Sequence, residues 1–451
     1  MPEGTFLVKY SRRRRHPVVT ADGEGVVNHV GALLLKELAD RMGLTDDLSR
    51  ALSQARLRRS AYDPAAILRD VAVTLANGGD CIADLAALRG QETLFGKVAP
   101  DVTAWRAVRN TAPRCLAGIK TARATARARA WAAGAGPKGE MILDFDATLI
   151  VSHSDKEGAR GTWKRTFGFH PLLCYLDNTS EPLAGMFRPG NAGSDSAADH
   201  IAVLDEALAQ IPSPYRENQP ILARADSAGG SHEFVDALRE RGVRFTVGFQ
   251  MGEAVREATL RAPEPAWVPA LDQDGEEREG AEVCELHSLD LSAWPEGTRA
   301  ICRRERAHPG AQLKFWEDRG IRHQVFITDQ ADEDVTMLEM RHRQRAHVED
   351  RIRCGKATGL ECFPSHYWGF NEVWLELILI AQTLIAWLQL LCLTGEARLW
   401  EPKRLRYRLF HTAAQIARTS RRIRLRLQRS WPWTWELDRA FTRLRLLPAA
   451  P

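Results

Sequence analysis

Two aspartates, Asp144 and Asp146, alternate with apolar residues in the segment 141–147. An extended strand turns every second side chain to the same face, so the two carboxylates share a face. Burying two like charges side by side is costly unless a cation or a proton intervenes. Divalent ions such as Mg²⁺ prefer carboxylate oxygens, so the pair predicts a metal site. A strand end open to solvent would accommodate the same pair.

A further aspartate, Asp226, ends the apolar segment 220–225 and is followed by Ser227 and, two residues on, by a pair of glycines. Sheets of the α/β class place ligand-binding groups at the carboxyl ends of their strands. If the two apolar strands are neighbours, Asp226 lies near the first pair. An aspartate that caps the following helical turn would give the same local pattern.

A predicted helix over 333–356 carries His342, Arg345, Glu349 and Lys356, which are separated by three, four and seven residues. At this spacing a helix places all four side chains on one face. One carboxylate among cations suits a metal ligand with phosphate-binding neighbours. Ordinary surface ion pairs would use the same residues.

The elements that must position these residues follow a break at Gly134, Gly136 and Pro137. Before it, residues 28–135 have helical apolar spacing throughout. After it, short apolar segments with turns between them predict an antiparallel meander of three strands. Alternating helices and strands then predict a mixed α/β sheet, with helices at 199–211 and 232–242 and strands at 220–227 and 243–250.

Two later segments differ from this pattern. Residues 252–320 are rich in proline, glycine and acidic residues and are predicted to be an insertion, followed by a strand at 323–328. Residues 373–393 approach the length of a membrane span, but Glu376, Gln382 and Gln389 interrupt them. A carboxylate inside a membrane is costly, so a buried core helix is favoured and no membrane partner is expected.

Positive charge is concentrated at the two ends of the chain, although the net charge is only +4. Residues 12–15 are four arginines, and residues 401–451 hold thirteen basic and three acidic residues. Such a density binds a polyanion by neutralising phosphates, although a solvated basic tail would look the same. A strand at 423–427 would place Arg424 and Arg426 on one face. The tryptophans at 431, 433 and 435 are interpreted as core residues rather than as base-stacking ones.

Composition and cysteine spacing bound the remaining possibilities. A chain of 451 residues predicts two to four domains, and 44% hydrophobic with 27% charged residues is ordinary globular usage. The eight cysteines form no Cys-x-x-Cys pair and no zinc-finger cluster. Free thiols in a reducing cytoplasm are therefore expected.

The spacing of the helical residues resembles the Tyr-Arg-Glu-Lys signature of insertion-sequence transposases, with His342 in the place of tyrosine. The Asp-x-Thr of the first acid in that family resembles Asp146-Ala147-Thr148, which favours Asp146 over Asp144. The second acid resembles Asp226 in its Ala-Asp-Ser context. The resemblance covers roughly residues 138–395, and the segments 143–159 and 187–200 resemble one bacterial subgroup of the family.

The resemblance implies a ribonuclease-H-like mixed sheet flanked by helices, interrupted by a β-rich insertion and preceded by an all-helical N-terminal domain. Asp146, Asp226 and Glu349 would hold two Mg²⁺ or Mn²⁺ ions, with Asp144 as an alternative ligand. The expected DNA contacts are His342, Arg345, Lys356, Arg404, Arg424 and Arg426. The expected divisions are 1–136 for DNA binding, 137–251 with 321–400 for catalysis, 252–320 for the insertion, and 401–451 for further DNA contacts.

The activity implied is metal-dependent cleavage of DNA at terminal inverted repeats, followed by strand transfer into target DNA. A homodimer is expected because two DNA ends must be joined, and the expected location is the bacterial cytoplasm at the nucleoid. Two alternatives stay open at this stage: a metal-dependent nuclease that cuts without joining, and an inactive DNA-binding regulator.

Overall fold

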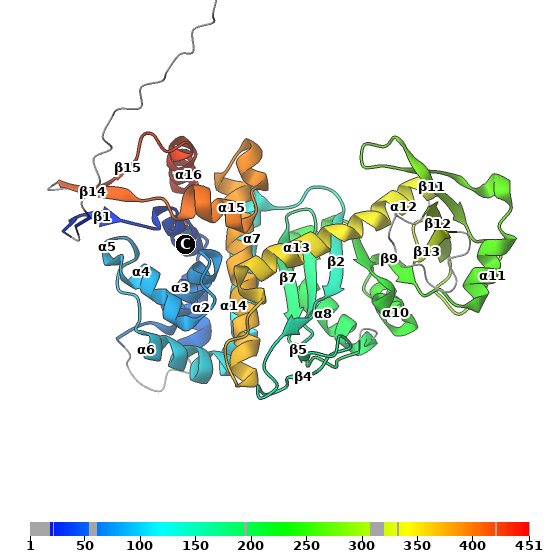
Figure 1. Cartoon of the computed structure of the whole chain (residues 1–451), viewed down its shortest axis with the longest axis horizontal. Coiled ribbons are helices and arrows are strands. Elements are labelled where there is room, and N and C mark those ends of the chain that lie inside the picture. Colours follow the sequence, from blue (N-terminus) through cyan, green and yellow to red (C-terminus); the bar gives the residue numbers. More distant parts are fainter. Residues whose placement is uncertain are drawn as a thin grey trace, which may run out of the picture.

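The computed structural model describes residues 19–20, 22–53, 61–193, 196–306, 320–331, 333–419 and 422–450. The arginine cluster at 12–15 lies outside the described residues. The described chain contains a nine-stranded mixed sheet, which confirms the predicted α/β class, and a helical region beside it (Figure 1). Residues 307–319 of the predicted insertion also lie outside the description.

The nine-stranded sheet has the order β10-β11-β12-β13-β9-β8-β2-β6-β7. Strands β2, β8 and β9 are parallel neighbours, and all other neighbours are antiparallel. The strands are β2 (Met141–Ala147), β6 (Leu172–Leu176), β7 (Glu181–Met186), β8 (Ile221–Ala225), β9 (Arg244–Phe249), β10 (Val268–Leu271), β11 (Glu277–Glu285), β12 (Arg299–Arg306) and β13 (Ile321–Thr328).

The predicted meander is present as β2, β6 and β7, and the helices that follow cover the sheet. Helix α8 (Ala197–Gln210) contacts β6 and β7, and it begins where the Ser196 side chain accepts a hydrogen bond from the Asp199 backbone. Helix α9 (Ser213–Asn218) leads into β8, and α10 (His232–Glu240) connects β8 to β9. The parallel pairs thus follow from helical crossovers, as the sequence pattern predicts.

The chain leaves the large sheet after Ala147. Residues that follow it form a small sheet of order β3-β5-β4, from β3 (Ile150–Val151), β4 (Arg160–Gly161) and β5 (Phe167–Phe169). This sheet was not predicted, because strands of two or three residues are too short to show an alternating pattern.

The insertion segment extends the same sheet instead of forming a separate layer. After α11 (Glu253–Arg261), strands β10, β11 and β12 add to the edge of β13, which pairs with β9. Helix α12 (Val335–Arg343), a 3₁₀ turn (Gln344–Ala346) and α13 (His347–Gly355) then cross the sheet as the predicted long helix (Figure 1).

Helix α14 (Trp368–Trp387) lies between the helical region and the sheet, in contact with α3 and with β7. Among the described helices, only the one spanning Trp368–Cys392 is long and apolar enough to cross a membrane, and 83% of its most apolar window is buried in the protein. Its Glu376 is buried beside Arg123 of α7, with Arg123 Nε 2.7 Å from Glu376 Oε1. The prediction of a core helix is confirmed, and its carboxylate has a cation as partner.

The helical region combines both ends of the chain. Its N-terminal helices are α1 (Leu33–Arg41), α2 (Leu44–Leu52), α3 (Pro64–Ala76), α4 (Ala86–Arg89), α5 (Glu92–Phe95), α6 (Asp101–Arg106) and α7 (Leu116–Ala130). The C-terminal residues add α15 (Pro402–Leu405), β14 (Ala414–Thr419), β15 (Arg422–Leu427) and α16 (Thr434–Leu446). A short strand β1 (Val26–Val27) pairs with β14, and α1 contacts α16. Arg41 donates to the backbone carbonyls of Arg445 and Leu447 at 2.6 Å.

Candidate active site

Asp146 and Asp226 lie side by side at the carboxyl ends of two neighbouring strands, Asp146 as the last residue but one of β2 and Asp226 directly after β8. Strands β2 and β8 run parallel with Phe145 opposite Ala225, and the next residue of each chain is the aspartate. One oxygen of Asp226 accepts from the Ala228 backbone at 3.0 Å, so this residue also caps the turn that follows. One oxygen of Asp146 accepts from the Ala147 backbone at 2.9 Å. Neither carboxylate forms an ion pair with a described residue, so each keeps an oxygen for another ligand.

Glu349 reaches the same area from the long helix. It lies in the first turn of α13, the helix that contacts β2, and its side chain is 66% exposed. Arg345, one turn earlier, places its guanidinium 3.7 Å from the Glu349 carboxylate. The helix therefore brings one acid and one cation to the strand ends.

The pKa of Asp146 reports how these groups interact. It is raised to about 6, chiefly by burial; the charge of Arg345 lowers it, and the charges of Asp226 and Glu349 contribute to the rise. Three carboxylates with one cation leave an excess of negative charge in a partly buried place. A divalent cation with oxygen ligands fits this donor set.

The three carboxylates are spread more widely than the ligands of a single ion. Among the described residues, the only three candidate ligands whose donor atoms all lie within 4.8 Å of one another are Asp80, Cys81 and Asp84. There Asp84 accepts from the backbone of Asp80 and Cys81 and so caps a helical turn. Two ions about 3.5–4 Å apart can be held by carboxylates that lie farther from one another, because carboxylates on opposite sides of the ion pair bind different ions.

Asp144, the alternative metal ligand, has a different partner. Its buried carboxylate accepts two hydrogen bonds from Arg224, at 2.6 Å to Nε and 2.7 Å to Nη2. Burial raises the pKa of Asp144 to about 6, and the Arg224 guanidinium opposes this shift by binding the ionised form. The sequence predicts that a metal ion compensates the charge of Asp144. In the structure, the Arg224 guanidinium compensates this charge through an ion pair within the sheet.

Arg224 joins the elements on which the site is built. It lies opposite Asp144 in the parallel register, and it also contacts the Asp177 carboxylate at 2.9 Å and the Arg341 carbonyl at 3.0 Å. His347, the first residue of α13, lies 3.2 Å from the same Asp177. Two strands and α12 thus meet at one guanidinium, and Asp177 links it to α13, the helix that carries Glu349. No local sequence pattern gives Arg224 this role in advance, although Arg224-x-Asp226 mirrors Asp144-x-Asp146.

His342 does not present a free imidazole to solvent. Its ring stacks on Phe326 of β13 with a centroid distance of 4.3 Å, and its Nδ1 lies 2.9 Å from the Thr246 hydroxyl. Burial and the charge of Arg345 lower its pKa to about 3, so the ring is neutral. The side chain is nonetheless only half-buried and lines a cavity beside Asp226, so the DNA contact predicted for His342 stays a prediction.

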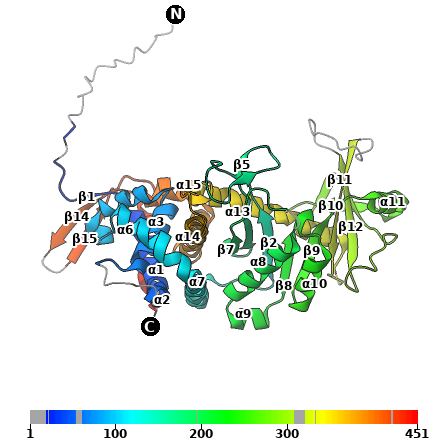
Figure 2. The same cartoon turned by 90° about the horizontal axis from the view of Figure 1, so that it is seen from below.

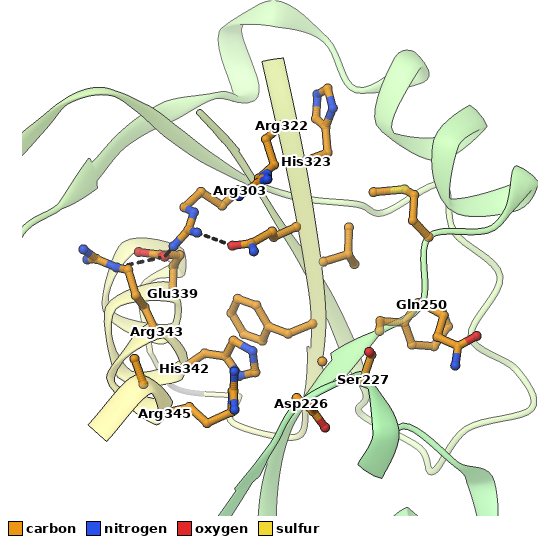
Figure 3. A pocket seen from close by; sticks show the side chains of 17 residues that line it. Asp226, Ser227, Gln250, Arg303, Arg322, His323, Glu339, His342, Arg343 and Arg345 are labelled. Atoms are coloured by element: carbon orange, nitrogen blue, oxygen red, sulfur yellow. Dashed lines mark hydrogen bonds and ion pairs between the residues drawn. The ribbon is translucent and has the colours of Figure 1, made fainter. Parts of the chain in front are cut away.

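A cavity of about 720 Å³ opens beside Asp226, between α12 and the ends of β9 and β13. In Figure 3, Asp226 and Arg345 lie toward one end of it and Arg303 and Arg322 toward the other. Arg303 and Arg343 contact the buried Glu339 carboxylate, at 2.6 Å and 3.1 Å. The cavity wall is therefore rich in cations next to the acidic site.

The other predicted DNA contacts are distributed over two places. Lys356 follows α13 directly, about 10 Å along the helix axis from Glu349 at 1.5 Å per residue, and its side chain makes no hydrogen bond or ion pair with a described residue. Arg404 is exposed on α15. Arg424 and Arg426 are exposed on β15 while Leu425 and Leu427 are half-buried, as the predicted alternation requires. Strand β15 lies across α14 from β2 (Figure 1), so these arginines form a separate surface.

The clustered tryptophans are mostly packing residues. The rings of Trp431 and Trp433 lie 4.9 Å apart, and the Arg408 guanidinium lies over Trp433 at 4.6 Å. Both are half-buried, whereas Trp435 is 61% exposed. The core interpretation therefore holds for two of the three.

Comparison with known proteins gives one family and one structural likeness. No curated protein matches the chain. Among solved structures, the chain is similar to piggyBac transposase, seen by cryo-EM in a synaptic complex with hairpin DNA, at 9% identity and a TM-score of 0.41, over 79% of this chain and 74% of that one. The family model for transposase DDE domain group 1 matches residues 10–449, nearly the whole chain. The chain therefore belongs to the DDE transposases.

Proposed function

We propose that this transposase cleaves DNA at the terminal inverted repeats of an insertion sequence and transfers the freed strand into target DNA. The observation that carries the proposal is the parallel register of β2 and β8, which brings Asp146 and Asp226 together next to the helix of Glu349. Local sequence motifs alone do not require that neighbourhood.

Asp146, Asp226 and Glu349 would hold two Mg²⁺ or Mn²⁺ ions. When bound, such ions activate a water or a 3′-hydroxyl on one side of the scissile phosphodiester and stabilise the leaving oxygen on the other. Arg345, beside Glu349, is placed to contact a phosphate oxygen and to limit repulsion among the carboxylates. Lys356 would contact the DNA farther along the same helix as a point charge.

The strand order β7-β6-β2-β8-β9 supports a ribonuclease-H-like catalytic core. Its first three strands in the chain form an antiparallel meander, and two parallel strands follow on the other side of β2. We assign residues 137–251 and 321–400 to this core, with 252–320 as the insertion. The segments 1–136 and 401–451 would bind DNA, and their contacts with each other place them in one unit.

DNA is the proposed partner, as both inverted-repeat and target duplex. Arg404, Arg424 and Arg426 would contribute phosphate contacts on the surface formed by α15 and β15, distant from the carboxylates. A homodimer would hold two ends together during transfer. All eight cysteines are free thiols, which suits the bacterial cytoplasm proposed as the location.

The test is a cleavage assay on duplexes that span the ends of the element encoding the gene. Asp146→Asn, Asp226→Asn and Glu349→Gln should each reduce Mg²⁺-dependent cleavage by at least a hundredfold. Asp350→Asn is the matched control, since Asp350 follows Glu349 on α13 but pairs with Arg353 at 2.6 Å. Normal cleavage by the first three variants would refute the site.

The same reactions, run with labelled ends and a supercoiled target, separate the two remaining enzymatic outcomes. Joined products support transposition, whereas cleavage without joined products would favour a nuclease. If the wild-type protein binds the DNA but does not cleave it, an inactive DNA-binding regulator is favoured.

A further inference from the structure

A short hairpin of β4 and β5, which follow β2 in the chain, carries an exposed aromatic residue and two cations at its tip. Strands β4 and β5 are joined by Trp163, Lys164 and Arg165, and all three side chains are exposed, Trp163 by 75%. The Lys164 ammonium lies over the Trp163 ring at 4.9 Å. A large exposed aromatic group is informative, because such area is normally buried unless a partner covers it.

The tip has a fixed shape. The Thr162 backbone donates to Thr166 at 2.7 Å, the Arg165 backbone donates to Thr162 at 3.0 Å, and the two threonine hydroxyls lie 2.8 Å apart. Arg165 has a φ of 59°, in the left-handed region that arginine seldom adopts. Residues kept in such conformations occur preferentially at functional sites. The turn thus holds its three outward side chains in place at some conformational cost.

The base of the hairpin is anchored to the body of the protein. The Glu157 backbone donates to the His366 carbonyl at 2.9 Å, and the Glu157 carboxylate accepts from the Trp368 backbone at 2.7 Å. Gly158 faces the Trp368 ring so closely that a Cβ would lie 2.2 Å from it. Figure 2 shows the hairpin, marked by β5, standing out from the body. An anchored base with a projecting tip is suited to reach a ligand bound outside the sheet.

The length of chain between the hairpin and Asp146 limits how far the tip can lie from the reacting phosphate. Strand β3 begins four residues after Asp146, and β5 leads into β6, where Leu173 is paired with Asp146. Nine residues separate Leu173 from Lys164, which span at most about 31 Å at 3.4 Å per residue, and the strand pair adds about 5 Å. Duplex DNA rises about 3.4 Å per base pair, so the tip lies no farther than about ten base pairs, one helical turn, from Asp146.

We propose that Trp163, Lys164 and Arg165 bind DNA within about ten base pairs, one helical turn, of the scissile phosphate. The two cations would contact phosphates, and the indole would stack on a base made accessible near the cut. Indole faces stack on any base, and neighbouring cations neutralise the backbone, so the chemistry of the tip matches this ligand. The proposal rests on the proposed function, because it needs DNA at the acidic site.

The experiment places 2-aminopurine, one position at a time, within twelve base pairs of the cleavage site in an end duplex. With full-length protein, the fluorescence change on binding should differ between wild type and Trp163→Ala at one or two adjacent positions within about ten base pairs of the cut. Trp163→Phe should restore most of the change, because phenylalanine still offers a ring. Binding by Trp163→Ala should weaken roughly 5- to 150-fold.

Two further variants sharpen the test. Trp435→Ala removes another exposed tryptophan, on α16, and should leave the fluorescence profile near the cut unchanged. Lys164→Ala combined with Arg165→Asn removes both cations while asparagine tolerates the left-handed backbone. The slope of log affinity against log salt should then become shallower by about 1.8, since each phosphate contact contributes about 0.9.

The tip proposal is overturned if wild type and Trp163→Ala give the same profile and affinity, or if they differ only beyond one helical turn from the cut. An unchanged salt slope in the double variant also overturns it. If the tip variants behave as wild type while Asp146→Asn fails to cleave, the proposed function stands without this contact. If Asp146→Asn cleaves normally, the proposed function itself is wrong.

Discussion

Replacing Asp146 and Asp144 by asparagine, one at a time, should change stability in opposite directions. The two residues share one face of β2 and are two residues apart. Asp146 has Asp226 and Glu349 as electrostatic neighbours, whereas Asp144 forms two hydrogen bonds with Arg224. The same chemical change therefore removes repulsion at one position and breaks an ion pair at the other.

The magnitude for Asp146 follows from its pKa. A rise from 3.8 to about 6 means that the folded protein binds this proton more tightly than the unfolded chain does. The ionised form therefore destabilises the fold, fully above pH 6 and not at all below pH 4. At about 1.4 kcal/mol per pKa unit, Asp146→Asn should stabilise the metal-free protein by roughly 1–3 kcal/mol at pH 8.

For Asp144 the opposite sign is expected, although burial raises its pKa to about 6 as well. Both Asp144 oxygens accept from Arg224, and asparagine would turn an amide donor toward one of these guanidinium N–H groups. Asp144→Asn leaves the Arg224 guanidinium buried, with Asp177 as its remaining carboxylate. Breaking a buried pair by removing one partner costs about 3–5 kcal/mol. Asp350→Asn, on an exposed site, should stay within about 0.5 kcal/mol of wild type.

The assay is urea unfolding in EDTA at pH 8 and at pH 4, repeated at pH 8 with Mg²⁺. In EDTA at pH 8 the midpoint should rise for Asp146→Asn and fall for Asp144→Asn, and the gain of the former should vanish at pH 4. Mg²⁺ should raise the wild-type midpoint and raise that of Asp146→Asn less, because binding to the folded state stabilises it. A lower midpoint for Asp146→Asn in EDTA at pH 8 would refute the electrostatic reasoning.

Three further outcomes are expected. Because a proton competes with the cation at Asp146, the Mg²⁺ concentration for half-maximal cleavage should rise as the pH falls below about 6, and a titration with no change between pH 5.5 and 7.5 would contradict this. Arg224→Lys loses the two-pronged contact with the strand before Asp146, so cleavage at limiting Mn²⁺ should fall at least tenfold and recover in part at high Mn²⁺; equal loss at all Mn²⁺ concentrations would show a different role. Arg424→Ala with Arg426→Ala should make the salt slope of DNA binding shallower by about 1.8 while cleavage at saturating DNA stays unchanged, measured by anisotropy and by single-turnover cleavage.

The central strands could be predicted from sequence because their signal is local. In segment 141–147, apolar residues continue through a whole strand and alternate with the two aspartates toward its end. Glycines and prolines separate this segment from its neighbours. The small sheet could not be found this way: Arg160 and Gly161 are both exposed and give no alternation. The pairing of β1 with β14 joins residues nearly the whole chain apart, and two-residue strands carry no sign of their partner.

The candidate site was predictable in its residue types but not in its pairings. Periodicity placed Asp144 and Asp146 on one face correctly, yet only the register with β8 shows that Arg224 neutralises the first. Helical spacing placed His342 on the face of Arg345 and Glu349, but β13 packs against α12 and covers its ring. Such tertiary contacts come from segments far away in sequence, so no local pattern contains them.

The union of the two chain ends changes how shortened proteins must be interpreted. A protein that stops before residue 414 loses the partner strand of β1, the contact of α16 with α1 and both carbonyl acceptors of Arg41. Its N-terminal helices would then lack α16 as a packing partner. Weak DNA binding by such a deletion would measure misfolding as much as the missing arginines, so point substitutions on β15 are the sound way to map that surface.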